Sequence, residues 1–476
     1  MSHDAVVVGA GPNGLAAAIE LQTHGCSTLL VDAAEEVGGS ARTEEVTLSG
    51  FLHDVGSAIH PLGFGSPFFS SLPLDSFGLE WVHPDAPLAH PLTGSPTAFL
   101  EKSLELTASS LGEDGNAWAR RFGPFVASQQ TFFEHILRSP LTVPTAPILM
   151  ARFGTLALQS TSRLAKPFQE KQARALLAGN AAHAGTPLSH PLTGAVGATL
   201  IVAAHTVGWP FPKGGAGQLT AALARYFESL GGTIETGCRV RSLADLPAAR
   251  AILLALTNGQ VAELKDTGLP ESFHRKLQSW RYGAGAFKVD WALDGPIPWL
   301  DPEVARAATV HIGGTLEEIT ASELEPLSGG VSERPFVLLA QHTLFDPTRA
   351  PEGKHTAWGY CHVPNGWDGD ATSAIEAQIE RFAPGFKARV LCRSSWSTKR
   401  LERWDSNLVG GDINGGALTM NQTLGPSRWR LPGYRTPRRG LYLCSASTPP
   451  GGGVHGMAGF HGARSALRHT FGINPT

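Results

Sequence analysis

The chain has 476 residues, of which 42% are hydrophobic and 17% are charged, and its formal net charge is -3. This composition is typical of a folded protein with a large core, and it excludes a disordered chain. The charges are nearly balanced and the basic residues form no cluster, so we expect no nucleic-acid partner. The 55 glycines are about 12% of the chain, against an average of about 7%, and indicate many close backbone approaches.

The five cysteines lie far apart in the sequence and form no CxxC pair. This spacing argues against a disulfide framework and against a thiolate metal site. We therefore predict no bound metal and a reducing, cytoplasmic location. The first residues lead directly into an apolar run at 5–8, without the basic and cleavage segments of a signal peptide, which supports the same expectation.

The first 32 residues have the pattern of a strand–helix–strand unit. A short apolar run at 5–9 precedes helical apolar spacing over 15–23, and a second buried strand at 27–31 follows. Later helical patterns occupy 112–138, 167–182 and 216–230, and later strand-like runs occupy 233–240, 251–256, 286–293, 336–341 and 440–444. The alternation predicts an α/β fold whose domains are interleaved along the chain.

A GxGxxG motif follows the first strand and begins the first helix, and Asp32 follows at the end of the second strand. The motif consists of Gly9, Gly11, Pro12, Asn13 and Gly14. Its glycines permit a tight turn, a close approach to a pyrophosphate and close packing of the helix on the strand. The free N–H groups of the helix would bind phosphates, and Asp32 would accept hydrogen bonds from the ribose hydroxyls. The context predicts a dinucleotide site.

A second glycine motif, absent from ordinary NAD domains, lies just after Asp32. It comprises Gly38, Gly39, Arg42 and Thr43. Paired glycines allow close approach to a pyrophosphate, and Arg42 has the fork-shaped guanidinium that suits phosphate. The segment resembles the GGxxRT element of the FAD-binding amine oxidase and phytoene desaturase superfamily. The resemblance implies that the dinucleotide is FAD.

Further segments extend this resemblance over essentially the whole chain, to phytoene-dehydrogenase-like flavoproteins that include those similar to animal pyridine nucleotide-disulphide oxidoreductase domain-containing protein 2. Segment 50–61 is similar to the part that lies beside the isoalloxazine ring, segment 407–416 is a further shared element, and segment 440–463 is similar to the strand–helix junction that faces the flavin pyrimidine. The contacts that the resemblance implies in these segments and near the adenine are Gly56, Ser57, Val240, Gly453, Val454, His455, Gly456 and Met457.

The resemblance also implies the domain organisation. We expect a discontinuous, Rossmann-like FAD-binding domain of the glutathione-reductase and amine-oxidase type, formed by 1–68, 205–285 and 405–476. An interleaved α+β substrate domain would comprise 69–204 and 286–404. The motifs contain no attachment signature, so we expect noncovalent FAD, with His60 and Cys444 as the residues that could contradict this expectation.

Lys288, His60 and His455 are the candidate catalytic residues. Alternation along 282–291 places Lys288 and Asp290 on one face of a strand and apolar side chains on the other. Lys288 is either an ion-paired or snorkelling lysine at a strand edge, or it resembles the lysine that holds a water at flavin N5 in amine oxidases. His60 and His455 fall inside the flavin-side motifs, although an isolated histidine in apolar surroundings is usually a core residue.

Three tracts, 55–74, 175–212 and 440–463, contain no Asp, Glu, Lys or Arg. They make an apolar pocket plausible, and the middle tract favours a buried helix over a lipid-contacting tunnel wall or a membrane span. Together with the resemblance, they predict hydride transfer between a lipid- or polyene-like substrate and flavin N5, giving a C=C bond, with O₂ or a quinone as acceptor.

Several alternatives stay open. The same flavin site suits C–N oxidation of an amine, a redox-neutral isomerisation or the saturation of an alkene. A non-catalytic prenyl- or lipid-binding protein of the same fold is the alternative from another class, because the Rab GDP-dissociation inhibitors share it. Peripheral contact with a membrane and a homodimer are two further associations that the sequence leaves open.

Overall fold

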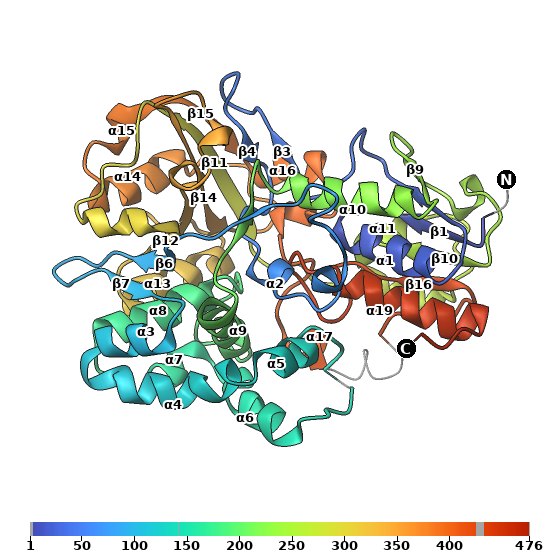
Figure 1. Cartoon of the computed structure of the whole chain (residues 1–476), viewed down its shortest axis with the longest axis horizontal. Coiled ribbons are helices and arrows are strands. Elements are labelled where there is room, and N and C mark those ends of the chain that lie inside the picture. Colours follow the sequence, from blue (N-terminus) through green and yellow to red (C-terminus); the bar gives the residue numbers. More distant parts are fainter. Residues whose placement is uncertain (1–2, 141, 425–432, 476) are drawn as a thin grey trace.

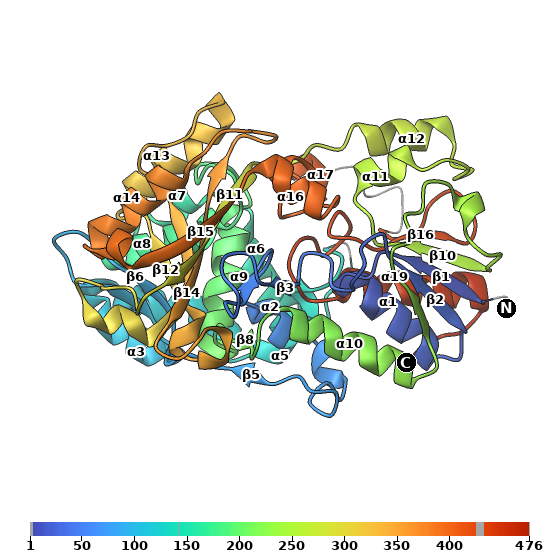
Figure 2. The same ribbon diagram turned by 90° about the horizontal axis from the view of Figure 1, so that it is seen from above.

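The computed structural model describes residues 3–140, 142–424 and 433–475 (Figure 1). Its two principal β-sheets lie in separate parts of the molecule, a five-stranded sheet on the right of Figure 1 and a seven-stranded sheet on the left. Viewed from above, α2 and β3 lie in the region between the two parts, and α10 begins there and runs beneath the part with the five-stranded sheet (Figure 2). The mixed α/β class expected from the sequence is confirmed.

The five-stranded sheet is entirely parallel. Its order is β16 (Leu441–Leu443), β10 (Ala251–Leu254), β1 (Ala5–Val8), β2 (Thr28–Val31) and β9 (Thr233–Glu235). One face is covered by α1 (Pro12–Thr23), α10 (Gly217–Ser229) and α19 (Met457–Ala466), and the other by α11 (Asn258–Glu263) and α12 (Glu271–Gln278). Both faces of the central strands are therefore buried, which explains their continuous apolar runs.

The seven-stranded sheet is mixed. Its order is β15 (Val390–Trp396), β11 (Gly285–Leu293), β14 (His355–Val363), β13 (Val337–Ala340), β12 (Ala307–Ile312), β6 (Ala86–His90) and β7 (Ala98–Leu100). The pairs are antiparallel except β12–β6. Strand β11 lies inside the sheet, between β14 and β15, so its side chains are supported from both sides.

Most of the remaining helices form a layer beside the second sheet or lie at its ends, and α17 lies near the middle of the molecule (Figures 1 and 2). They are α3 (Leu104–Ser110), α4 (Gly115–Val126), α5 (Gln129–Ile136), α6 (Pro147–Ala157), α7 (Thr161–Leu164), α8 (Lys171–Ala182), α9 (Thr193–Thr206), α13 (Leu316–Leu324), α14 (Thr372–Phe382), α15 (Phe386–Arg389), α16 (Thr398–Trp404) and α17 (Met420–Leu424). Short elements near the middle are α2 (Pro61–Phe64), β3 (Thr43–Glu44) with β4 (His53–Asp54), and β5 (Trp81–Val82) with β8 (Phe211–Pro212).

The uncharged tract 175–212 contains the end of α8, the buried helix α9 and β8. Most of α9 is buried, as expected, but Val196 and Leu200 on it also face an internal cavity, so the helix is part of a cavity wall as well. Within the described ranges, none of the helices combines the length and apolar character that a membrane crossing needs.

Some element boundaries differ from those expected. The helical pattern at 112–138 is divided, because α4 ends at Val126 and α5 begins at Gln129. The strand expected at 233–240 ends at Glu235, shortly before Gly237, whose φ of +69° is incompatible with a continued strand. Segments 1–68, 205–285 and 405–476 all contribute strands to the parallel sheet, while the exact domain boundaries stay a prediction.

A buried carboxylate joins distant segments where the two parts meet. Asp54 accepts hydrogen bonds from Thr43 Oγ1 at 2.7 Å and from the Ala216 N–H at 2.8 Å, and its Oδ2 lies 2.7 Å from Arg349 Nη2. Burial alone would raise the pKa of Asp54. The Arg349 guanidinium, His342 and the two hydrogen bonds outweigh burial and lower that pKa to about 2.

We predict that Arg349→Met lowers the free energy of unfolding by roughly 3–5 kcal/mol, because it leaves the Asp54 carboxylate buried and unpaired. The double variant Asp54→Asn/Arg349→Met should lose less. The contribution of Asp54 is fully present above its unfolded pKa of 3.8 and is lost as the pH falls toward about 2. Urea unfolding measures these changes.

The matched control is Lys213→Met, which removes an exposed ion pair with Glu80 and should cost about 1 kcal/mol or less. An Arg349→Met protein as stable as the Lys213→Met control would contradict the importance given to the buried pair.

Candidate functional site

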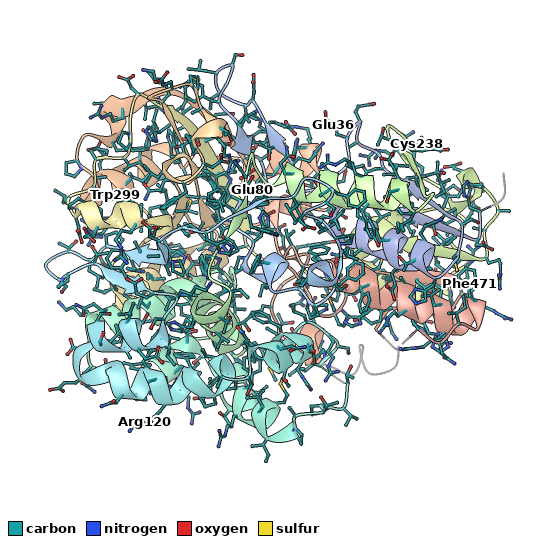
Figure 3. The ribbon with its side chains drawn as sticks, viewed as in Figure 1. Glu36, Glu80, Arg120, Cys238, Trp299 and Phe471 are labelled. Atoms are coloured by element: carbon teal, nitrogen blue, oxygen red, sulfur yellow. The ribbon has the colours of Figure 1, made fainter. Side chains whose placement is uncertain are left out.

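A single continuous cavity of about 1850 Å³ runs from the carboxyl ends of the parallel strands to the helices beside the second sheet. Individual ligand sites usually measure roughly 300–1,000 Å³, so this cavity has room for a dinucleotide and a second molecule. Figure 3 shows Glu36 and Cys238 at the upper edge of the part that contains the five-stranded sheet. Both residues belong to the lining of the cavity.

The cavity brings together most of the site residues expected from the sequence. Those in its lining are Gly9, Gly11, Pro12, Asn13, Gly14, Asp32, Gly39, Arg42, Gly56, Ser57, His60, Val240, Lys288, Gly453, Val454 and His455. Outside the lining are Gly38, Thr43, Gly456 and Met457. The Thr43 hydroxyl is bound to Asp54, and the Met457 side chain is buried in the core, which explains why these two side chains do not face the cavity.

Close backbone contacts require glycine at the centre of the first motifs. A Cβ atom at Gly14 would lie 1.7 Å from the Gly9 carbonyl oxygen, and one at Gly56 would lie 2.1 Å from the Ser40 carbonyl oxygen. A Cβ at Gly39 would lie 3.1 Å from the Gly11 Cα. The two glycine motifs therefore pack directly on each other and form one narrow cradle.

Asp32 is held rigidly at the end of β2. Its Oδ2 accepts a hydrogen bond from the Ala10 N–H and its Oδ1 accepts one from the Ala34 N–H at 2.7 Å. The Cys238 N–H donates to the Asp32 carbonyl at 2.7 Å. The carboxylate is thus oriented at the cavity wall, where it fits a ribose.

Arg42 is fixed by contacts that the sequence did not reveal. Its guanidinium lies over the Trp404 ring at 4.2 Å, Nε donates to the Gly39 carbonyl at 3.1 Å, and Nη2 donates to the Trp404 carbonyl at 3.2 Å. The Ser40 hydroxyl donates to Asp405, whose pKa is raised by burial. Trp404 and Asp405, at the end of α16, carry no recognisable motif and lie more than 360 positions away, so no local pattern could have identified them.

Lys288 lies in the opposite wall, on the interior strand β11. It is 2% exposed, and its Nζ donates to both oxygens of Asp290, at 2.9 and 2.7 Å. Lys288 is therefore ion-paired, but on an interior strand and not at a strand edge, and its resemblance to the amine-oxidase lysine stays a prediction. Burial lowers the pKa of Lys288 and raises that of Asp290 to about 6, although the two charges attract each other.

Aromatic side chains surround this ion pair. The Lys288 Nζ lies 5.7 Å from the ring centres of both Trp358 and Trp396. Trp358 lines the cavity, and its buried indole N–H has no hydrogen-bond partner in the described structure.

His60 and His455 are both buried in the wall of the cavity. His60 Nε2 lies 3.0 Å from the Ser57 hydroxyl, and His455 Nδ1 accepts the Met457 N–H at 3.1 Å. Burial lowers the pKa of each imidazole to about 4, so both are neutral at neutral pH. They can position a bound molecule by hydrogen bonding, but they supply no permanent positive charge.

The inner arm of the cavity is mostly apolar and is formed by α5, α6, α9 and neighbouring loops. Its side chains include Ile136, Leu137, Met150, Phe153, Ala157, Leu192, Val196 and Leu200. The arm is suited to a hydrocarbon.

Across residues 3–140, 142–424 and 433–475, no group of three or more His, Cys, Asp or Glu side chains is arranged to hold a metal ion.

Comparisons with known proteins agree with this geometry. A family model described as an NAD(P)-binding Rossmann-like domain matches residues 7–70. The chain is 27% identical to the rat pyridine nucleotide-disulfide oxidoreductase domain-containing protein 2, over 98% of this chain and 93% of that protein. It is 25% identical to a lycopene-forming phytoene desaturase of Paracoccus sp., over 96% and 95%.

Solved structures show the same fold. A putrescine oxidase superposes with a TM-score of 0.64 at 18% identity, covering 99% of this chain and all of the other. Cyclohexylamine oxidase from Brevibacterium oxydans superposes with a TM-score of 0.60 at 16% identity, covering 98% of each chain. The resemblance expected from the sequence motifs is confirmed.

Proposed function

We propose that the chain, which is similar to phytoene desaturases and amine oxidases, is an oxidoreductase that binds FAD noncovalently and transfers a hydride between an apolar, lipid- or polyene-like substrate and flavin N5. One observation carries the proposal: a glycine cradle with an oriented Asp32 and an apolar arm belong to the same cavity. We favour desaturation of a C–C bond, with O₂ or a quinone as the final acceptor.

The residues present fit FAD. A Cβ atom at Gly14 or Gly56 would overlap a backbone carbonyl, so glycine is needed to keep the shape of the cradle, and Asp32 is aimed by two backbone N–H groups. Helix α1 begins at Pro12, so its free N–H groups and positive dipole face the phosphate end. When bound, the flavin would supply an atom that accepts or returns a hydride.

The chain's own residues would orient the reactants and exclude water. The apolar arm would hold a hydrocarbon by burial of its surface, and neutral His60 and His455 would bind polar ring atoms by hydrogen bonds. Val55 and Ala58, next to the expected ring position, pack in one cluster with Trp358 and Trp396. Lys288, which lies between these indoles, would place a positive charge near the reacting atoms.

A second candidate is the oxidation of a C–N bond. It is supported by Lys288, which resembles the lysine of amine oxidases, and by the fold, which is similar to that of two amine oxidases. A redox-neutral isomerase or a saturase would use the same arrangement. A non-catalytic prenyl-binding protein is disfavoured, since it would have no use for the narrow glycine cradle. Peripheral membrane contact and homodimer formation stay proposals.

The purified protein should show a flavin visible spectrum, and acid precipitation should release free FAD into the supernatant. Flavin that remains in the pellet would contradict noncovalent binding.

Asp32→Ala should weaken FAD binding by about 1–3 kcal/mol through lost charge-assisted hydrogen bonds, whereas the exposed Asp75→Ala should leave FAD binding unchanged. Anaerobic bleaching of the flavin by candidate polyenes, lipids or amines then identifies the substrate class.

Lys288→Met tests whether the flavin reacts with oxygen through this lysine. Loss of one well-placed electrostatic group typically slows a step by about 10²–10³, and we expect that slowing when photoreduced protein is mixed with O₂ in a stopped-flow instrument. The variant Lys288→Met/Asp290→Asn is the matched form, because it leaves no unpaired buried carboxylate. An unchanged rate in folded protein would favour a quinone-coupled desaturase or an isomerase.

A further inference from the structure

A line of polar side chains leads from the cavity wall to the protein surface. Lys288 lines the cavity and is bonded to Asp290. His53 Nδ1 lies 3.5 Å from Asp290 Oδ1, and His53 Nε2 lies 2.8 Å from Thr47 Oγ1. Thr47 is half-buried and is followed by three exposed residues at 48–50, which form a surface turn. The line begins in the cavity and ends where bulk water is within reach.

The two inner members of this line are enclosed. Asp290 is 0% exposed and His53 is 2% exposed, and neither lines the cavity. His53 Nδ1 has no hydrogen-bond partner in the described structure, so it is available for contact with Asp290 after a small rotation of the ring. Buried polar and charged groups are costly, and a continuous series of them between the cavity and the protein surface calls for a role.

We propose that Asp290, His53 and Thr47 form a proton relay that connects the Lys288 ammonium group in the cavity with the protein surface. Each neighbour in the series is at, or within a small rotation of, hydrogen-bond distance. Each member also has the chemistry of a relay, since a carboxyl, an imidazole and a hydroxyl can all accept one proton and release another.

Outward transfer leaves every member in its starting charge state. A proton that reaches Lys288 Nζ displaces an ammonium proton onto Asp290. The imidazole, whose Nδ1–H faces the Asp290 carboxylate at rest, exchanges its proton from Nδ1 to Nε2, and Nδ1 then takes the proton of the Asp290 carboxyl. The proton on His53 Nε2 then moves to the Thr47 hydroxyl, which gives up its own proton to water. The transfer ends with a carboxylate on Asp290 and the imidazole proton on Nδ1, which is the resting state.

The acidities suit a relay that works through the neutral imidazole. Burial, together with Lys288 and Arg349, lowers the pKa of His53 to about 3, and burial raises that of Asp290 to about 6. A lasting imidazolium is therefore disfavoured, while a protonated Asp290 is accessible near neutrality. The titratable and charged groups that face His53 are Asp54 from its own strand, Lys288 and Asp290 from β11, and His342 and Arg349 from the segment before β14.

The role of the relay rests on the proposed function. Oxidation of a C–H bond beside a second C–H or an N–H bond removes a hydride and a proton, and the proton has to leave an apolar, water-poor site. Reversal of the same path would bring in the protons consumed when O₂ is reduced. The existence of the relay can, however, be tested without any turnover.

The first test is ¹⁵N NMR of histidine-labelled protein, with His53 assigned by its loss in His53→Gln. Above the pKa of Asp290 its carboxylate should accept a hydrogen bond from His53 Nδ1–H. Below that pKa the protonated carboxyl should donate to Nδ1, which leaves the proton on Nε2 facing Thr47. We therefore expect the two ring nitrogens to exchange protonation state between about pH 5 and 8 while the ring stays neutral.

Asp290→Asn should abolish this tautomer switch. A His53 ring that keeps one tautomer over the whole range, that becomes doubly protonated, or that switches equally in Asp290→Asn would overturn the proposal. These outcomes are independent of flavin, because the measurement can be made on protein with or without cofactor.

The second test follows proton release with a pH indicator dye when substrate or photochemistry changes the flavin's redox state. Thr47→Val should slow the release by roughly ten-fold or more, whereas Ser49→Ala, on the same surface turn, should leave it unchanged. Equal rates in both variants would reject Thr47 as the exit. Protein that binds no flavin would refute the proposed function, and the NMR measurement would then decide on its own whether the relay exists.

Discussion

The ion pair of Asp54 with Arg349 organises the middle of the molecule. The carboxylate comes from the segment after the second glycine motif, one of its hydrogen-bond donors lies just before α10, and the guanidinium belongs to the segment between β13 and β14. A buried charge is tolerated only when its partners are in place, so this group allows few alternative arrangements of the three segments. As a result, the wall that carries Lys288 keeps a fixed position relative to the glycine cradle.

Two kinds of packing meet at the cavity. On one side, glycines allow backbone to touch backbone, and the resulting surface is narrow, polar and rigid. On the other, the helices α5, α6 and α9 offer apolar side chains around a wider space. A molecule bound on the first side would be fixed by hydrogen bonds, and a second molecule on the other side would be held by burial of its apolar surface. Such a division suits an enzyme that has one invariable cofactor and a flexible, hydrocarbon-rich substrate.

The dinucleotide end could be predicted from the sequence because its determinants are local. Gly9, Gly14 and Asp32 lie within one strand–helix–strand unit, and their spacing alone indicates their use. Likewise, alternation along β11 correctly placed Lys288 beside Asp290. The partners Arg349, Asp405 and Trp404 could not be predicted, since each meets its counterpart about 295 to 365 positions away and no short pattern surrounds it. The interior position of β11 could not be predicted either, because its two neighbours, β14 and β15, lie much further along the chain.

The strand order of the parallel sheet has a consequence for how the protein is made. Strand β16 closes one edge of the sheet, yet it comprises residues Leu441–Leu443, close to the end of the chain. During synthesis on the ribosome, one edge of β10 therefore has no partner strand until almost two hundred further residues have been added and β16 has been made. Unpaired edges attract other chains. We expect nascent chains of this protein to depend on chaperones until residues 441–443 have been synthesised and can pair with β10.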